Sequence, residues 1–588
     1  MRTRNRVGLV ALVLLIAFLL IQTALARSSV ETTDEVTLTL IGRVVNTGGE
    51  PIPEAAVRVL LGNQECPILC EGRLVDVIYA GGDGLFVADV PLSTTQMTEI
   101  ETGQTQLTLV ATKACYRQTR VVVIPDSLYW EGVQAFARLP EIVLPRIFNP
   151  AFFLATAIFM VVFGLISLNL LHETIAAFLG AAAMLGVSYF IGNSNNAFWI
   201  ISFHRAITYI DFDVIFLLMT MMIFMAVMSQ TGIFRWLAFQ TFGLARGNAF
   251  LVTAVLVSIT GLTSSVLNDT TVMLLMTPVS IQIALALDIP PAAIVVPEVL
   301  ASNIGGAATL IGTPPNTIIG SYVGLSFNQF LVNMLPISVV SMAILLGMTR
   351  WLYRTEFGRE SKPPSAALIA KLEAGARITD PILLHKSLLL LGVTLALFFV
   401  GDLFHMPPAV VAILGSTALL LWVRPNVSEM LREVDWTTLV FFMSLFMMVG
   451  GIQEVGLIQL IAESVRGVAG DSLLLATLLI VWVSAVASAI VANIPFTAAI
   501  VPVTLFLTKT LPGAENNVLY WGLALGAGLG GNATYIGSAP NIVAVGIMDR
   551  AGFRLKFGDF SRVGVPVTFV TILVPTLWIL IRYFWLKF

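Results

Sequence analysis

The 588-residue sequence contains little charge, because Asp, Glu, Lys and Arg together make up only 11% of it. An ordinary soluble domain carries about 25% charged residues. The deficit therefore excludes a typical soluble enzyme. With 32 basic and 35 acidic side chains, the net charge of −3 gives no electrostatic basis for nucleic-acid binding. Hydrophobic residues make up 57% of the chain, which is typical of a polytopic membrane protein.

Cysteine and histidine are also scarce, with three and four residues. The histidines are scattered, so no metal cluster is predicted. No ATP-binding motif or nucleophile–base set is present, so we expect neither a primary pump nor an enzyme, and no cofactor. Cys66, Cys70 and Cys115 all lie before residue 150. In an oxidising compartment one disulfide is expected among these three, with its pairing left open. A zinc site is disfavoured because it lacks a fourth ligand.

The charged residues divide the chain into three regions. Residues 1–26 carry three Arg and no acid, followed by an apolar run, and predict a signal peptide or an N-terminal membrane anchor. Residues 27–149 hold 24 charges, whereas the 439 residues of 150–588 hold only 40. The middle region is thus predicted to face water and the remainder to form the membrane body. Because the first three Arg stay in the cytoplasm, residues 30–147 are expected to be extracytoplasmic.

Residues 30–147 alternate between apolar and polar side chains and are punctuated by Gly-rich turns, which predicts a β-sandwich. The expected strands are 36–46, 55–61, 85–90, 106–113, 119–124 and 139–144. The segments GRVVNTGGEPIPEAAVRVL (42–60), GGDGLFVADVP (81–91) and LTLVATKACYRQTRVVV (107–123) resemble the carboxypeptidase regulatory-like β-sandwich. That resemblance implies a non-catalytic module.

The membrane body contains an internal duplication. Four blocks in residues 211–336 recur in residues 435–566, at offsets of 224, 224, 225 and 230 residues, for example NIGGAATLIGTPPN and GLGGNATYIGSAPN. We therefore expect a first transporter repeat (150–354), a cytoplasmic linker (355–386) and a second repeat (387–588). The expected apolar stretches are 150–170, 174–192, 212–231, 248–287, 292–325 and 329–353, then 387–402, 407–423, 437–456, 472–511, 517–546 and 563–586.

Residues 248–287 and 472–511 each have a polar centre where a membrane span should be most apolar, so both are predicted to be re-entrant hairpins. Each repeat then has five full spans, and an odd number inverts the second repeat relative to the first. With residue 150 outside, fifteen of the twenty bases of the membrane body lie in cytoplasmic loops and five outside. This agrees with the positive-inside rule. The C-terminus is therefore also expected to be extracytoplasmic.

Four irregular segments at membrane depth form the predicted binding site. They are the hairpin tips Ser264–Thr271 and Ser488–Thr497 and the broken spans Gly305–Asn316 and Gly530–Asn541. Paired interruptions of this kind point to a transporter's substrate and ion sites, where helix N-termini favour an anion and side-chain oxygens favour Na⁺. The candidate residues are Asn268, Asp269, Thr270, Thr271, Thr309, Gly312, Thr313, Asn316, Asn493, Thr497, Thr534, Gly537, Ser538 and Asn541.

Asp269 is the sharpest candidate, because a carboxylate within a span costs about 2.5–3.5 kcal/mol even on insertion scales. It is predicted to bind Na⁺ or to carry a proton, with a structural helix cap as the alternative. The corresponding residue of the second repeat is Asn493, so the charge is asymmetric. For Glu298, which precedes the first break, an internal ion pair and a proton site are equal alternatives.

The membrane body is similar to the ion-transporter superfamily, in particular the arsenite/sodium–proton permease family, which is citrate transporter-like, and within it the P-protein-like branch. The resemblance rests on LNDTTVMLLMTPVSIQI, PEVLASNIGGAATLIGTPPNTII, ANIPFTAAIVPV and LGAGLGGNATYIGSAPNIVAVGI. It implies inverted repeats, re-entrant hairpins, an elevator-type transport domain and a homodimer. The Asn268–Asp269 order matches the arsenite branch, whereas the P-protein branch has Asp-Asn, so the substrate is left open.

Together these observations predict a secondary active transporter of a small anion, coupled to Na⁺ or H⁺, in the plasma (inner) membrane and in contact with lipid. A Na⁺/H⁺ antiporter and an arsenite-type permease are alternatives of the same class. An alternative of another class is a membrane-anchored sensor or adhesion protein that uses the β-sandwich. The duplicated polar breaks weigh against it, because an anchor does not need them.

Overall fold

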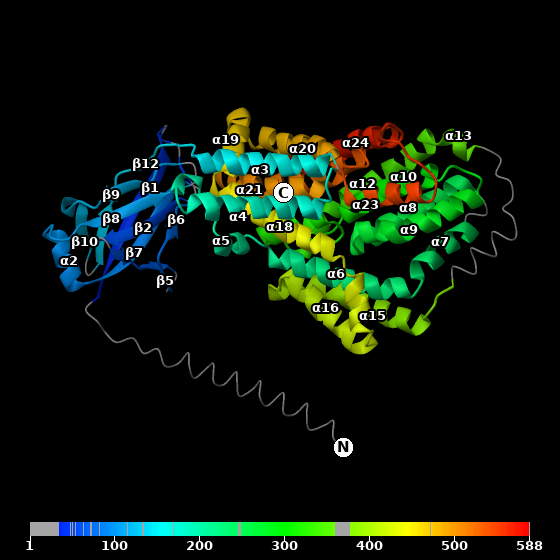
Figure 1. Cartoon of the computed structure of the whole chain (residues 1–588), viewed down its shortest axis with the longest axis horizontal. Helices are drawn as coiled ribbons and strands as arrows, with labels where there is room; N and C mark the ends of the chain where they lie inside the picture. Colours follow the sequence, from blue (N-terminus) through cyan, green and yellow to red (C-terminus); the bar gives the residue numbers. More distant parts are fainter. Residues whose placement is uncertain are drawn as a thin grey trace, which may run out of the picture. The chain divides into compact units, whose positions relative to one another are not determined.

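The computed structural model describes residues 35–586, except residues 48, 50, 53, 54, 63, 71, 72, 82, 114, 115, 132, 133, 169, 245–247, 359–376 and 471. The predicted signal peptide or anchor, Cys115 and most of the predicted linker lie outside the described residues. The chain divides into two compact units, Met1–Ile147 and Phe148–Phe588. The first unit is rich in strands, and the second is helical (Figure 1).

The N-terminal unit consists of two sheets. Its strands are β1 (Glu35–Asn46), β2 (Ala56–Leu61), β3 (Gln64–Cys66), β4 (Ile68–Cys70), β5 (Arg73–Val75), β6 (Ile78–Tyr79), β7 (Leu85–Ser93), β8 (Leu107–Thr112), β9 (Thr119–Val122), β10 (Leu128–Glu131), β11 (Gln134–Arg138) and β12 (Ile142–Leu144). One sheet has the order β10-β11-β1-β7-β4-β5, with β12 also paired to β1. The other has the order β3-β2-β8-β9, with β6 also paired to β2.

Alternation of side chains builds the core between the two sheets. In the first sheet Leu38 and Leu40 lie opposite Val90 and Ala88 of the antiparallel neighbour β7, and all four are buried. In the second sheet Val59 of β2 lies opposite Leu109 of β8 in the same way, and these inward residues belong to one cluster. Since successive residues of a strand point to opposite faces, this is the pattern that the alternating sequence predicts.

The observed elements differ from the expected ones in number. Six strands match the predicted segments, although β9 and β12 are shorter than predicted, and the sequence reasoning missed β3, β4, β5, β6, β10 and β11. It also missed helix α2 (Thr94–Glu101), which begins at a capping box formed by Ser93 and Gln96. The Ser-x-x-Gln spacing was a usable signal for this helix start. The missed strands are five residues or fewer, too short to show periodicity.

The expected disulfide is not formed at Cys66 or Cys70, and this part of the prediction was wrong. Both are free thiols. Cys66 ends β3 in one sheet and Cys70 ends β4 in the other, so the short connection crosses between the sheets. Cys66 packs in the core and Cys70 is exposed. Burial raises the pKa of the Cys66 thiol, which makes it a poor nucleophile.

The first half of the helical unit runs to residue 357. Its helices are α3 (Pro150–Ser167), α4 (Glu173–Gly186), α5 (Phe203–Thr208), α6 (Phe212–Gln230), α7 (Ile233–Leu244), α8 (Ala249–Val266), α9 (Asp269–Ala286), α10 (Ala292–Gly306), α11 (Pro314–Val323), α12 (Phe327–Leu352) and α13 (Arg354–Phe357).

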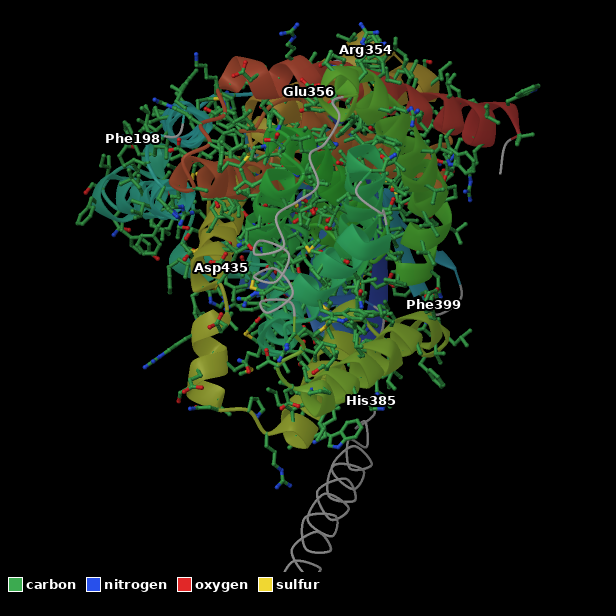
Figure 2. All side chains as sticks on the ribbon, turned by 90° about the vertical axis from the view of Figure 1, so that its right-hand side faces the viewer. Phe198, Arg354, Glu356, His385, Phe399 and Asp435 are labelled. Atoms are coloured by element: carbon green, nitrogen blue, oxygen red, sulfur yellow. The ribbon has the colours of Figure 1, made fainter. Side chains whose placement is uncertain are left out.

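The second half repeats this order of long helices. Its helices are α15 (Pro381–Gly401), α16 (Pro408–Val423), α17 (Val427–Glu433), α18 (Trp436–Glu454), α19 (Leu457–Ala469), α20 (Leu473–Ile490), α21 (Asn493–Thr510), α22 (Val518–Gly530), α23 (Ala539–Arg550) and α24 (Phe557–Ile579). Figure 2 labels Arg354 and Glu356 of α13, at the end of the first half, and His385 of α15, at the start of the second.

Within the described residues, ten helices are long and apolar enough to cross a membrane. They include α8, α9 and α20, which the sequence predicted to be arms of hairpins. The short helices α5, α7, α17 and α19 were not expected. Of these, α19 is amphipathic, and it connects α18 to the second hairpin.

The two halves interlock instead of packing as separate bundles. Helix α4 of the first half packs on α18 of the second, and α16 of the second half packs on α6 of the first. In the same reciprocal manner, α11 packs on α21 and α23 packs on α9. Helices α12 and α24, which hold equivalent places in the two halves, contact each other (Figure 1). Each half therefore completes the surroundings of the other half's hairpin.

Candidate functional site

The first hairpin turns between Val266 and Asp269. Its polar tip follows from the sequence, because the side chain of Asn268 accepts hydrogen bonds from the backbone N–H groups of Thr270 at 3.1 Å and Thr271 at 3.3 Å. Asn268 is thus the N-cap of α9. The alternative role predicted for Asp269 was that of a structural helix cap. Asn268 supplies this cap, so the carboxylate of Asp269 is not needed for it.

The first broken span lies between the end of α10 at Gly306 and the start of α11 at Pro314. The side chains of two candidates, Thr309 and Asn316, stabilise the backbone conformation of the break. The hydroxyl of Thr309 donates to the carbonyl of Ser265 and accepts from the N–H of Gly312 at 3.1 Å. The Asn316 amide donates to the carbonyls of Thr309 at 2.8 Å and Ala307 at 3.1 Å. These groups satisfy an unwound backbone inside the protein.

The tip and the break of the first half are joined. The N–H of Asp269 donates to the carbonyl of Gly312 at 3.2 Å. A Cβ atom at Gly312 would lie 2.7 Å from the carbonyl oxygen of Ser264, so only glycine allows this approach. The start of α9 consequently lies beside the start of α11, and two helix N-termini meet at the buried centre of the unit.

The second half repeats this construction residue by residue. The N–H of Asn493 donates to Gly537 O at 3.0 Å, and Thr534 donates to Ala489 O at 2.6 Å. Gly537 N–H in turn donates to the Thr534 hydroxyl at 3.2 Å, and the Asn541 amide donates to Gly531 O and Thr534 O, each at 2.9 Å. Gly312, Thr309 and Asn316 have these roles 225 positions earlier in the chain.

A cluster of three buried asparagines connects the two halves. The amide of Asn303 donates to Asn532 Oδ1 at 2.7 Å and to Asn541 Oδ1 at 2.9 Å. Asn532 in turn donates to the carbonyl of Leu300 at 3.3 Å. Sequence reasoning selected Asn541 but missed Asn303 and Asn532. The available signal was an amide side chain within two residues of each Gly-Gly pair, Asn303 before Gly305 and Asn532 after Gly531.

Several buried oxygen atoms in this region have no hydrogen-bond partner among the described residues. They are Asp269 Oδ2, Asn303 Oδ1, Asn316 Oδ1 and Ser538 Oγ. A buried polar atom without a partner costs about 1–3 kcal/mol, so such a concentration needs an explanation. Carboxylate, amide and hydroxyl oxygens are suitable ligands for Na⁺ and suitable acceptors for a proton.

Asp269 is the one charged member of this set. Only 1% of its surface is exposed. Its Oδ1 accepts from Thr270 N–H at 2.7 Å and from the Thr270 hydroxyl at 3.2 Å. The hydroxyl of Thr313 faces the same carboxylate, but Oδ2 has no partner with hydrogen-bond geometry among the described residues. The α9 N-terminus stabilises a negative charge at this position.

The remaining candidates have mixed surroundings. Thr497 donates to the carbonyl of Asn493 at 2.7 Å, one turn earlier in α21, which is a local helix contact. Asn493 and Ser538 are buried, and Thr270 and Thr271 are partly buried. The structure thus brings the fourteen candidates into two tip-and-break sets, with the asparagine cluster between the halves.

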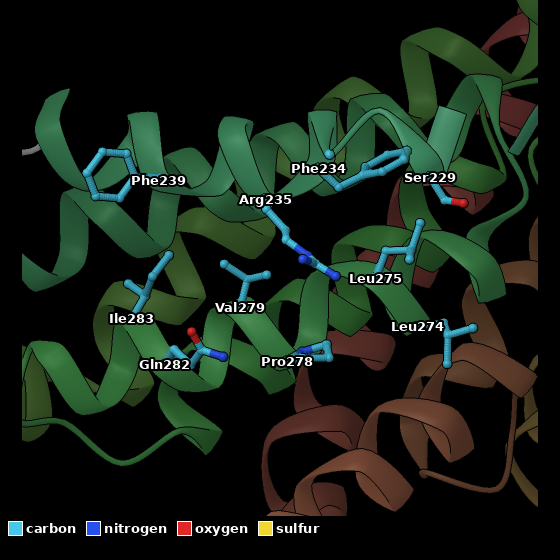
Figure 3. A pocket seen from close by; sticks show the side chains of 11 residues that line it. Ser229, Phe234, Arg235, Phe239, Leu274, Leu275, Pro278, Val279, Gln282 and Ile283 are labelled. Atoms are coloured by element: carbon cyan, nitrogen blue, oxygen red, sulfur yellow. The ribbon is translucent and has the colours of Figure 1, made fainter. Parts of the chain in front are cut away.

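A cavity of about 330 Å³ lies along α9, away from these sets. Its walls are mostly apolar, and Arg235 of α7 is its charged lining residue. Figure 3 shows the Arg235 side chain reaching toward the part of α9 that carries Leu275 and Pro278. A second cavity of about 290 Å³ lies between α6, α11 and the start of α16. Asp269 lines neither cavity.

Comparison with known proteins identifies the family. The family described as Citrate transporter (CitMHS) matches residues 158–526. The chain belongs to this family. It is a membrane transporter and an integral membrane protein, and the similarity of its membrane body to the ion-transporter superfamily is confirmed.

Relatives match about three quarters of the chain. The 46 kDa membrane protein of Mycobacterium leprae (strain TN) is 35% identical over 431 residues, which is 73% of this chain and 98% of that protein. The P protein of Homo sapiens is 32% identical over 506 residues, which covers 73% of this chain and 60% of that protein. Among solved structures, the YdaH transporter of Alcanivorax borkumensis aligns with a TM-score of 0.49 and 12% identity, over 71% of this chain and 99% of that one.

Proposed function

We propose that this citrate transporter family member is a secondary active transporter of a small anion, driven by Na⁺ or H⁺. The observation that carries the proposal is the repeated bond between hairpin tip and broken span, Asp269–Gly312 in one half and Asn493–Gly537 in the other. These bonds place the N-termini of α9 and α11, and those of α21 and α23, beside each other. Helix N-termini favour an anion, and the unpartnered oxygens favour a cation.

An elevator mechanism accounts for the arrangement of the halves. The reciprocal contacts of α4 with α18 and of α16 with α6 support two inverted repeats. The tip of each hairpin bonds to the middle of a broken span, which supports re-entrant hairpins that reach half-way through the membrane. Residues 213–325 and 437–546 would then move as one unit past a scaffold in a homodimer, and this movement gives alternating access.

The function can be tested with purified protein in proteoliposomes. Citrate is the first probe because of the family, and arsenite is the second. We expect uptake of one anion to depend on an imposed Na⁺ or H⁺ gradient and to vanish when the gradient is collapsed. Protein-free liposomes are the control. Na⁺/H⁺ exchange that no added anion alters would instead support an antiporter, which the presence of the buried carboxyls of Asp269 and Glu298 favours as the second candidate.

The proposed topology places residues 30–147 outside the cytoplasm and can be tested with the free thiols. In a Cys115→Ser background, a membrane-impermeant maleimide should label Cys70 on intact cells, because Cys70 is exposed. Cys66 should react much more slowly, since burial raises the pKa of its thiol and shields its sulfur. Adding Cys70→Ser should remove the fast labelling. Labelling that requires cell lysis would contradict an extracytoplasmic sandwich.

A further inference from the structure

A second buried carboxyl, Glu298, lies in the middle of α10 and plays no part in the site described above. None of its surface is exposed. The Thr260 hydroxyl of α8 donates to Glu298 Oε1 at 2.8 Å. The Ser280 hydroxyl of α9 lies near the same carboxyl but has no hydrogen-bond partner among the described residues. Oε2 has no hydrogen-bond partner among the described residues. Both arms of the first hairpin therefore place a hydroxyl near Glu298, and the one from α8 is hydrogen-bonded to it.

Among the described residues, the helices packed around Glu298 offer it no buried counter-charge. The helices packed on α10 include α8, α9, α12, α22, α23 and α24. Helix α8 has no charged residue, and α22 has Tyr520 as its titratable group. Helix α9 contributes only the acid Asp269. The charged residues of the other three helices are all exposed: Arg350, Asp549, Arg550, Asp559 and Arg562. A buried carboxylate without a cation is strongly unfavourable, and such a group is neutralised by binding a proton.

The duplication shows that packing does not require an acid at this position. Leu523 stands 225 residues after Glu298, and it is fully buried in α22. The two helix crossings are built alike, because Gly305 of α10 packs on the backbone of Gly261 as Gly530 of α22 packs on that of Ala485. An apolar side chain thus fills the equivalent site in the second half. The fold therefore does not require the carboxyl of Glu298, which is present in the first half alone.

Glu298 and Asp269 also differ in the donors that surround them. The carboxylate of Asp269 accepts a backbone N–H at a helix N-terminus, which stabilises its charged form. Glu298 is in mid-helix, and its polar neighbours among the described residues are the hydroxyls of Thr260 and Ser280. A further hydroxyl of α10 contacts the hairpin tip: that of Ser302, one turn after Glu298, lies 2.8 Å from that of Ser264 and donates to the backbone carbonyl of Asp269 at 3.2 Å. Because their environments differ in this way, we expect the carboxyls of Glu298 and Asp269 to have different functions.

We infer that Glu298 is a proton-binding site of the transport cycle, separate from the cation site at Asp269. This inference rests on the proposed function and specifies H⁺ as a coupling ion. While α8 and α9 enclose it, the Glu298 side chain holds its proton as a neutral acid. When the transport cycle brings water to the site, the O–H bond of the acid breaks, the proton passes to water, and the carboxylate remains. Rebinding a proton precedes closure.

An infrared titration of the reconstituted protein tests the site without any transported solute. Wild-type protein should show a carboxylic acid C=O band at pH about 7, where an ordinary Glu is ionised. Glu298→Gln should lack this band, whereas Glu429→Gln, which changes an exposed carboxyl of α17, should retain it. Identical spectra for wild type and Glu298→Gln would overturn the inference.

Proton flux provides the second measurement, with a pH-sensitive dye inside the liposomes and imposed citrate or Na⁺ gradients. Both Glu298→Gln and Glu298→Leu should reduce gradient-driven proton flux at least about tenfold. Leu is a suitable second variant because Leu523 fills the equivalent position. Proton flux equal to wild type in both variants would contradict the inference. If wild-type protein carries no solute at all, the proposed function fails, and the infrared spectra still decide the role of Glu298.

Discussion

Asp269→Asn is expected to lower ion-driven anion uptake at least about a hundredfold, because it removes the one charge at the tip of the first hairpin. The substitution preserves shape, and the amide oxygen still accepts from Thr270 N–H as Oδ1 does now at 2.7 Å. Oδ2 has no partner among the described residues, so the folded protein loses no hydrogen bond. The measurement is initial uptake in proteoliposomes, with thermal unfolding of the same preparation.

The control for this prediction is Asp559→Asn, which changes an exposed carboxyl in the first turn of α24. It should leave uptake and unfolding temperature near those of the wild type. The charge of Asp269 is responsible only if uptake falls while the unfolding temperature is maintained. Uptake by Asp269→Asn with wild-type rate and wild-type ion dependence would refute the role of Asp269 as an ion ligand.

Gly305→Ala is expected to destabilise the protein by about 3 kcal/mol or more, at the upper end for overpacking. Gly305 lies where α10 crosses α8, and its added Cβ would overlap the carbonyl of Gly261 and come within 2.6 Å of the Gly261 Cα. Backbone atoms cannot rotate away, so the whole helix would have to shift. Because α8 is an arm of the first hairpin, the shift would also displace Asp269 from Gly312.

A matched glycine distinguishes this clash from a general effect of alanine. Gly347 of α12 has no atom within 4 Å of the place of an added Cβ. Gly347→Ala should therefore be neutral or stabilise the helix by up to about 1 kcal/mol. The unfolding temperatures of the two purified variants in detergent provide the comparison. Equal unfolding temperatures would show that α8 and α10 do not approach as closely as the structure places them.

Much of the helical unit could be predicted because the membrane restricts the chain to a simple relation between sequence and structure. Apolar stretches of sufficient length form helices, since the backbone must satisfy its own hydrogen bonds in lipid. Gly, Pro and Asn at paired positions indicated both breaks, and the helices end and begin there at Gly306 and Pro314 and at Gly530 and Ala539. The short strands of the sandwich and the free state of Cys66 were beyond this reasoning. Both features depend on which of the two sheets each short segment joins, and that is decided by tertiary packing.

The sequence by itself determined that the chain is a duplicated membrane protein, with polar interruptions at equivalent positions and a family relationship in its motifs. Local periodicity, composition and a constant offset carry that information. Only the tertiary structure decided what each polar side chain does. The bond from Asn303 to Asn541 joins residues 238 positions apart, and the bond from Thr260 to Glu298 joins residues 38 apart. Residues so far apart in the sequence are brought together by the simultaneous packing of many apolar side chains. No local sequence pattern predicts such contacts.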